Sequence, residues 1–178
     1  MECPFEFDQA FLDDLPYEPR VLLLDRVESI DEIARTIVCR MPTDQPMPFT
    51  DAQRHHPVRH PHHVSGAAMV HATATLGFVH LYYMLGRRHA DGWVGYGTHI
   101  HRAVFRKLVP PGTPMFCLCK ESRARFMGDR IFVTYEFEYR HEGDVAYESK
   151  QSAMWINTQA GDSSGLGGVA PEGVNLTG

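Results

Sequence analysis

The chain has 178 residues, of which 43% are hydrophobic, and this size suits one globular domain with a substantial core. Its 17 Lys and Arg residues stand against 22 Asp and Glu residues, giving a formal net charge of −5 without a basic block, so we expect no nucleic-acid partner. No segment reaches the roughly 18 consecutive apolar residues that cross a bilayer, so we expect no membrane partner either.

The start of the chain and its cysteines both favour the cytoplasm. The acidic opening Met1-Glu2-Cys3-Pro4 lacks the positive charge with which a secretory signal begins. Cys117 and Cys119 are one residue apart, which places them on one face of a strand and does not match the C-x-x-C spacing of a zinc knuckle. We interpret all four cysteines, which also include Cys3 and Cys39, as free thiols of a reducing compartment.

The first predicted elements form a hairpin. Val21–Leu24 is apolar and compatible with a β-strand, and Ala34–Met41 alternates enough to be its partner. A turn near Asp31 and Glu32 would connect the two strands.

A long loop follows this hairpin. Five prolines among polar residues exclude regular secondary structure across the region: Pro42, Pro46, Pro48, Pro57 and Pro61. In compact domains, loops longer than about 12 to 15 residues are usually functional or disordered.

The next segment, Ala67–Leu85, predicts a helix that is apolar on nearly every side. Ser65 is a suitable N-cap, while Gly86, Arg87 and Arg88 suit the C-terminal end. A helix that is apolar all round is buried, so we expect a sheet to wrap it.

From Gly92 onward the pattern predicts strands separated by turns, the clearest turns being 109–112 and 141–144. The predicted strands are Trp93–Tyr96, Thr98–Lys107, Pro114–Arg123, Asp129–Arg140 and Val145–Ile156. One buried helix with a run of antiparallel strands is an α+β architecture. We expect a single domain over residues 1–157 and a flexible Gly-rich tail over 158–178.

The strongest candidate site is the segment from Arg54 to Gly66, which holds five of the eleven histidines directly before the helix. Histidine titrates near neutrality and can accept or donate a proton. The first backbone N–H groups of a helix can stabilise an oxyanion. A base beside oxyanion donors indicates acyl chemistry.

Other interpretations of these histidines are a surface loop without chemistry and a metal site. Neither a carboxylate nor a thiolate shares the cluster, and Asp51 is the only nearby acid, which disfavours a metal. The chain contains no G-x-G-x-x-G or P-loop pattern, so we expect no organic cofactor.

Three blocks of the sequence resemble a known family. Residues 15–27 (LPYEPRVLLLDRV), 102–112 (RAVFRKLVPPG) and 145–156 resemble the opening, a central strand and turn, and the closing strand of the 3-hydroxyacyl-acyl-carrier-protein dehydratases. That family has the hot-dog fold, an antiparallel sheet wrapped around one long helix. The resemblance implies a homodimer with active sites and acyl tunnels at the interface. Four helix side chains would line either the core or such a tunnel: Met69, Leu76, Phe78 and Leu81.

The resemblance also implies site residues. In the dehydratases a loop "H-F-P-G-x-P-x-x-P-G" supplies the catalytic histidine, and a Glu or Asp follows the last Gly by five residues. With Gly66 as that Gly, His71 stands at the position of the acid, and His56 (or its neighbour His55) or His60 takes the place of the base. His71 would donate a proton or orient water, and the Gly66 amide would polarise the thioester carbonyl.

A second branch of the same fold also resembles this segment. In the long-chain acyl thioesterases a "G-H-F" histidine precedes the helix and an amide residue stands eleven positions later, and His60 and His71 have this spacing.

From the three matching blocks we expect a dehydratase or hydratase acting on a 3-hydroxyacyl thioester of acyl carrier protein or CoA, in fatty-acid or polyketide-type biosynthesis. The alternatives are a thioesterase and a non-catalytic acyl-binding subunit. Phosphopantetheine or CoA would enter only as part of the substrate.

Overall fold

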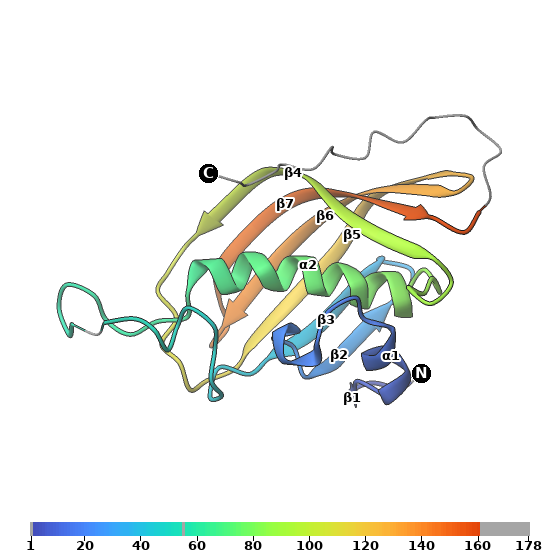
Figure 1. Ribbon diagram of the computed structural model, residues 1–178. Helices are drawn as coiled ribbons and strands as arrows, with labels where there is room; N and C mark the ends of the chain where they lie inside the picture. The colour runs from blue at the N-terminus through green and yellow to red at the C-terminus, as the bar shows by residue number, and fades with distance from the viewer. Residues whose placement is uncertain (1, 55, 161–178) are drawn as a thin grey trace, which may run out of the picture.

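A computed structural model describes residues 2–54 and 56–160 (Figure 1). The seven strands are β1 (Phe5–Glu6), β2 (Arg26–Asp31), β3 (Thr36–Met41), β4 (Trp93–Phe105), β5 (Met115–Met127), β6 (Arg130–His141) and β7 (Asp144–Asn157). The helices are α1 (Gln9–Asp14), the short 3-10 helix η1 (Pro19–Val21) and the long α2 (Gly66–Tyr83). All strands pair antiparallel in one sheet of order β1-β2-β3-β5-β6-β7-β4. The predicted α+β architecture is confirmed.

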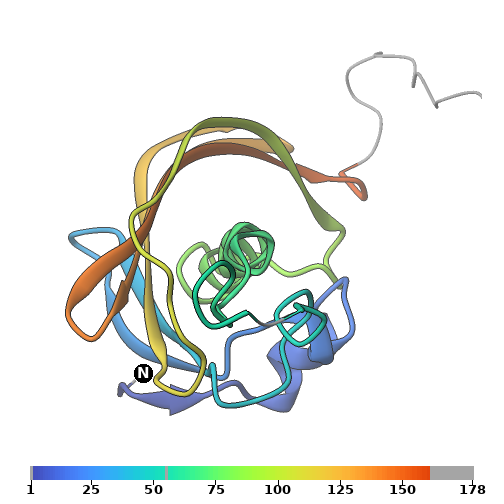
Figure 2. The same cartoon turned by 90° about the vertical axis from the view of Figure 1, so that its left-hand side faces the viewer.

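The sheet curves around α2, and the N-terminal segment lies along the other side of the helix (Figure 2). Phe11 packs at 5.1 Å and 5.2 Å between ring centroids on Tyr82 and Tyr83 near the helix end. Thr75, in the middle of α2, donates a 2.9 Å hydrogen bond to the Leu22 carbonyl. A helix without a wide polar face is thus covered from both directions, as its composition requires.

The beginning of α2 agrees with the prediction, and its end is shorter. Ser65 is the N-cap, and its Oγ accepts a hydrogen bond of 3.2 Å from the Ala67 N–H. The helix stops at Tyr83, so Arg87 and Arg88 lie beyond the last turn. They instead lie over the rings of Trp93 and Tyr82, 5.3 Å and 5.2 Å from the ring centroids.

The predicted first strand, Val21–Leu24, is wrong. Pro19 starts the 3-10 turn of η1, and Leu23 has a φ of 59°, a conformation that no strand contains. The strand begins only at Arg26, and the turn at residues 32–35 then leads into β3 as predicted. The apolar run is explained by burial alone, because Leu22 and Leu24 point into the core.

The two strands predicted at Trp93–Tyr96 and Thr98–Lys107 form the single strand β4. Its pairing with β7 shifts register between Gly97 and His99 and again between Ile100 and Arg102. Such bulges bend a strand without ending it, so β4 can follow the curve of the sheet. Gly97, which lies between the two predicted strands, is at a bend of β4 and not at a boundary.

The core lies between α2 and the concave face of the sheet. All four possible tunnel residues are buried there and belong to the core: Met69, Leu76, Phe78 and Leu81. Three free cysteines on β3 and β5 are also buried: Cys39, Cys117 and Cys119. Burial raises the pKa of each thiol well above its ordinary value. These thiols are packing residues rather than nucleophiles.

Strand β7, the last strand along the chain, ends at Asn157. The prediction of a flexible tail falls mainly on residues 161–178, which lie outside the described part of the chain, and it stays a prediction. None of the described helices is long and apolar enough to cross a membrane.

Candidate functional site

The N-terminus of α2 is fixed by two neighbouring loops. The Val64 N–H donates to the Val109 carbonyl at 2.7 Å, and the Ser65 N–H donates to the Thr50 Oγ1 at 3.0 Å. The Gly66 N–H, the next along the chain, has no hydrogen-bond acceptor among residues 2–54 and 56–160. This amide is therefore free to bind a carbonyl oxygen or an oxyanion.

Gly66 also lies against an aromatic ring. A Cβ atom at this position would lie 2.9 Å from the Cε1 of Phe105, so a larger residue would displace that ring. The ring of Phe105 thus lies directly against the backbone at the start of α2. Close packing and a free amide at Gly66 occur together.

His71 lies on α2 and faces the N-terminal segment. Its Nε2 is 2.7 Å from the Val21 carbonyl oxygen, and its ring meets the ring of Tyr17 edge-on at 6.4 Å between centroids. A carbonyl only accepts hydrogen bonds, so the proton of the neutral imidazole sits on Nε2 and the lone pair on Nδ1. In this tautomer Nδ1 can accept a proton but cannot donate one.

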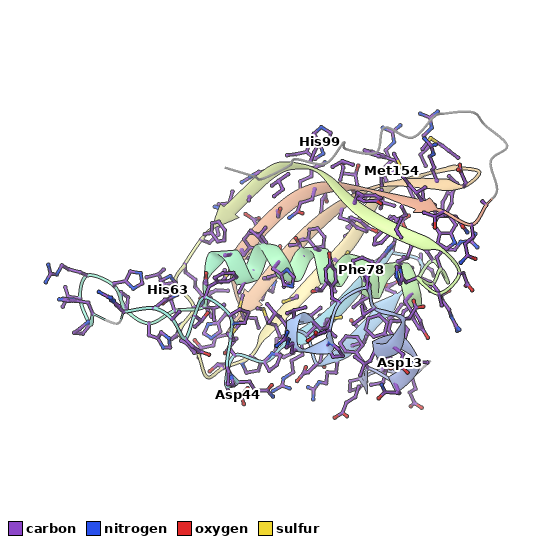
Figure 3. The ribbon with its side chains drawn as sticks, in the orientation of Figure 1. Asp13, Asp44, His63, Phe78, His99 and Met154 are labelled. Atoms are coloured by element: carbon purple, nitrogen blue, oxygen red, sulfur yellow. The ribbon has the colours of Figure 1, made fainter. Side chains whose placement is uncertain are left out.

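His56 and His60 lie together in the loop before α2. Their backbones form an isolated β-bridge with hydrogen bonds of 2.8 Å and 2.9 Å, and the His56 Nδ1 accepts from the Arg59 N–H at 2.9 Å. The loop, in which Figure 3 labels His63, projects away from the sheet and helix. No hydrogen bond joins it to His71 within the described ranges, so one chain does not bring the predicted loop base and His71 together. His55 is not among the described residues.

The other loop histidines hold backbone carbonyls. The His62 Nε2 lies 3.0 Å from the Thr50 carbonyl oxygen, and the His63 Nδ1 lies 2.8 Å from that of Pro61. In the part of the chain with described coordinates, no three His, Cys, Asp or Glu side chains are grouped so that they could hold a metal ion.

A cavity of about 100 Å³ lies between α2 and strands β4, β6 and β7. Six aromatic rings contribute to its wall: Tyr17, Phe78, Tyr96, Tyr135, Phe137 and Trp155. Thr73 and Gln151 add polar atoms on one side, where the Gln151 Nε2 donates to the Thr73 Oγ1 at 2.9 Å. Phe78 is the one candidate tunnel residue that lines this cavity.

A buried chain of hydrogen bonds ends at the same cavity. The Trp155 Nε1–H donates to the Tyr135 hydroxyl at 3.1 Å, and that hydroxyl lies 3.1 Å from the His80 Nδ1. The His80 Nε2 lies 3.1 Å from the Glu121 Oε2, and Arg35 binds both oxygens of the same carboxylate. Because the carboxylate only accepts, the His80 proton sits on Nε2 and the Tyr135 O–H donates to Nδ1.

The charges of this chain follow from burial and pairing. Burial lowers the pKa of His80, which favours the neutral ring, although Glu121 acts in the opposite direction. Burial alone would raise the pKa of Glu121, but its side-chain interactions with His80 and Arg35, together with the charge of Arg35, outweigh this and lower the pKa to about 2. The stable state at neutral pH is a neutral His80 beside an ionised Glu121.

The sequence alone does not predict this series of hydrogen bonds or the cavity, because the residues that form them are far apart along the polypeptide. His80 and Glu121 are separated by 41 positions, and each sits in a segment whose local pattern predicts only a helix or a strand. One feature of the sequence relates to the cavity, namely the glycine at position 95. Gly95 on β4 leaves room for the indole of Trp155, since a Cβ there would lie 2.1 Å from the ring.

Comparison with known proteins supports the fold. No protein-family model matches the chain, and neither does any curated protein. A mutant of the thioesterase PA1618 from Pseudomonas aeruginosa is similar in structure, with a TM-score of 0.54 and 15% identity over 83% of this chain and 92% of that one. The thioesterase HI1161 from Haemophilus influenzae is similar with a TM-score of 0.50 and 17% identity over 74% and 78% of the two chains. At these identities the likeness shows the hot-dog fold, as predicted, and not a particular reaction.

The first testable prediction concerns Glu121. Its pKa is lowered in the folded state, so its stabilising effect is complete above the ordinary pKa of 4.5 and is lost as the pH falls towards 2. We expect Glu121→Gln to lower the free energy of unfolding by about 2 kcal/mol at pH 7 and by much less at pH 3. Urea denaturation at both pH values measures this difference.

The matched control is Glu136→Gln on β6, which removes an exposed ion pair with Lys150 of 3.2 Å. Exposed pairs contribute little, so the control should change stability by less than about 0.5 kcal/mol at either pH. An equal loss for Glu121→Gln at pH 7 and pH 3 would contradict the assigned charge state.

Proposed function

We propose that this protein hydrolyses acyl thioesters, with His71 as the general base and the Gly66 amide as the carbonyl polariser. The observation that supports this most is the 2.7 Å contact between the His71 Nε2 and the Val21 carbonyl oxygen. That contact leaves the Nδ1 lone pair available for a proton. The sequence of α2 contains no Asp or Glu, so its half-exposed base candidate is this histidine.

The proposed reaction needs one water molecule. His71 Nδ1 accepts a proton from water while the water oxygen attacks the thioester carbonyl carbon, and the free Gly66 N–H stabilises the oxyanion that forms. The C–S bond then breaks, and the imidazolium returns its proton to the leaving thiolate. The products are a free acid and a thiol, and the Val21 carbonyl keeps the ring oriented throughout.

The alternative reaction is dehydration. It is favoured by residues 15–27, which resemble the opening of the dehydratases. That reaction needs a proton donor where His71 stands. In the tautomer described above, the only proton of the ring is bound to the Val21 carbonyl. The neutral ring thus presents an acceptor and no donor at Nδ1, which favours hydrolysis, and the two structural neighbours, whose names are those of thioesterases, support the same choice.

We also propose a homodimer in which β4 faces a second copy. Strand β4 is the long edge of the sheet and has thirteen residues paired on one side only. Its exposed residues include Tyr96, Ile100 and Phe105, which are 57%, 55% and 52% exposed. A long apolar edge invites pairing with another chain unless it is covered. The projecting loop with His56 and His60 could then reach the partner's site.

The proposed substrate is a thioester of CoA or of acyl carrier protein, both of which carry anionic phosphate groups. Three cations lie on β4 and in the turn after it, within three residues of Phe105, whose ring lies against Gly66: Arg102, Arg106 and Lys107. Arg106 is paired with Glu148, and Lys107 lies 3.1 Å from Asp144, which leaves Arg102 without a carboxylate partner among the described residues. Cations near the proposed oxyanion site would favour such substrates.

The second prediction tests the base. His71→Gln should lower the rate of thiol release from acyl-CoA substrates by about a hundredfold or more, since an amide cannot accept the proton. His89→Gln is the matched control, because the His89 Nδ1 also lies near a carbonyl, 3.1 Å from that of Trp93, at the far end of the helix. The control should retain full activity.

Intact-mass measurement of the same reactions identifies the chemistry. Free acid and free thiol are the expected products. Loss or gain of one water with the thioester intact would contradict hydrolysis and establish the dehydratase alternative. Binding without any turnover would leave only the acyl-binding subunit.

The third prediction tests the dimer. Ile100→Arg places a charge at the centre of the proposed interface and should convert a dimer into a monomer, halving the mass measured by light scattering. The control is Ile33→Arg in the turn before β3, where the side chain is already 98% exposed. A wild-type chain that is monomeric at high micromolar concentration would contradict the proposal.

A further inference from the structure

We propose that the cavity between α2 and strands β4, β6 and β7 is the acyl pocket, that it takes a compact acyl group, and that Tyr135, His80 and Glu121 are positioning residues for its wall. This inference rests on the proposed function, since it assigns the substrate class of the same site. A compact group here means a chain of up to about six carbons or a single ring, given the size of the cavity.

The cavity lies beside the proposed base. Tyr17 connects the two, because its ring meets the ring of His71 at 6.4 Å and the ring of Phe78 at 5.8 Å between centroids. Phe78 and Tyr17 both line the cavity. An acyl group attached to a carbonyl near His71 can therefore enter between α2 and the sheet.

The volume limits what fits. About 100 Å³ is of the same order as an engineered apolar cavity of about 150 Å³ that binds benzene, so one ring or a short chain is the largest group expected to fit. A chain of twelve or more carbons would need the wall to move. The aromatic lining also suits a flat or short apolar group, because ring edges and faces pack closely with little loss of side-chain entropy.

Trp155 closes the inner end of the cavity. Its ring packs edge-on against Phe78 at 5.0 Å between centroids and lies under Gly95, where no Cβ could fit. Gly77 on α2 approaches the same ring, since a Cβ there would lie 3.6 Å from its Cζ2. The position of one indole thus decides how deep the cavity is.

The buried hydrogen-bond chain holds that indole. The Trp155 N–H is bound to Tyr135, the Tyr135 O–H to His80, and the His80 Nε2–H faces Glu121. The first two links are hydrogen bonds that run in one direction, from the indole to the hydroxyl and from the hydroxyl to the imidazole, and the third is a 3.1 Å contact between His80 and the carboxylate that Arg35 binds. Removing the Tyr135 hydroxyl breaks it at its centre without changing the size of the ring.

The experiment uses Trp155 as its own reporter. In a Trp93→Phe background, Trp155 is the only tryptophan, so its fluorescence follows occupation of the cavity. The probes are the thioethers S-hexyl-CoA, S-benzyl-CoA and S-dodecyl-CoA, which cannot be hydrolysed, with CoA alone as the blank. We expect hexyl and benzyl probes to change the fluorescence and to bind at least tenfold more tightly than the dodecyl probe.

Tyr135→Phe should reduce this discrimination about tenfold, because the indole can then swing away and admit the longer chain. Tyr139→Phe is the matched control: Tyr139 is buried on the same strand, its hydroxyl has no partner among the described residues, and it does not line the cavity. This control should keep the discrimination of the parent. Gly77→Ala should stabilise α2 while narrowing the cavity, so it should weaken binding of S-benzyl-CoA without unfolding.

Three results would overturn the inference. Equal affinity for hexyl and dodecyl probes contradicts a compact pocket, and unchanged fluorescence with bound probe contradicts the location. A Tyr135→Phe variant that loses stability but keeps its discrimination shows that the chain is structural only. Because the probes report binding without turnover, these results are independent of whether the reaction is hydrolysis or dehydration.

Discussion

The structure depends on one constraint: α2 has no polar face wide enough to meet water. The sheet covers one side of it, and the N-terminal segment covers the other (Figure 2). That segment meets the helix with backbone as well as side chains, so its carbonyls need donors. His71 and Thr75 supply them to Val21 and Leu22. The need to bury a helix thereby fixes the tautomer of a histidine at the proposed site.

The same constraint explains how polar groups are distributed in the core. Where α2 faces β5 and β6, His80 is fully buried, and it is satisfied on one side by Tyr135 and faces Glu121 on the other. Breaking such a chain leaves a buried group without a partner, which costs more than an ordinary hydrogen bond contributes. This cost makes the wall beside the cavity rigid. A rigid wall is what a pocket of defined depth requires.

Much of the fold follows from local signals in the sequence. Ser65 and the apolar run after it predict α2, and the turns at 109–112 and 141–144 separate the strands correctly. Val21–Leu24 misled because apolar residues are needed equally by a strand and by a buried irregular segment, and the carbonyls that distinguish the two find their donors fifty residues later. The site is harder still. Gly66 and His71 are recognisable by position, whereas the link from Trp155 to Glu121 depends on pairings between strands that no local pattern encodes.

The central claim is that His71 presents a lone pair on Nδ1 because the Val21 carbonyl holds its proton on Nε2. Long-range proton–nitrogen NMR correlation of the imidazole at pH 7, assigned by comparison with His71→Gln, measures this directly. The account predicts that the neutral ring carries its proton on Nε2. A neutral ring with its proton on Nδ1 would contradict it and remove the base from the proposed reaction.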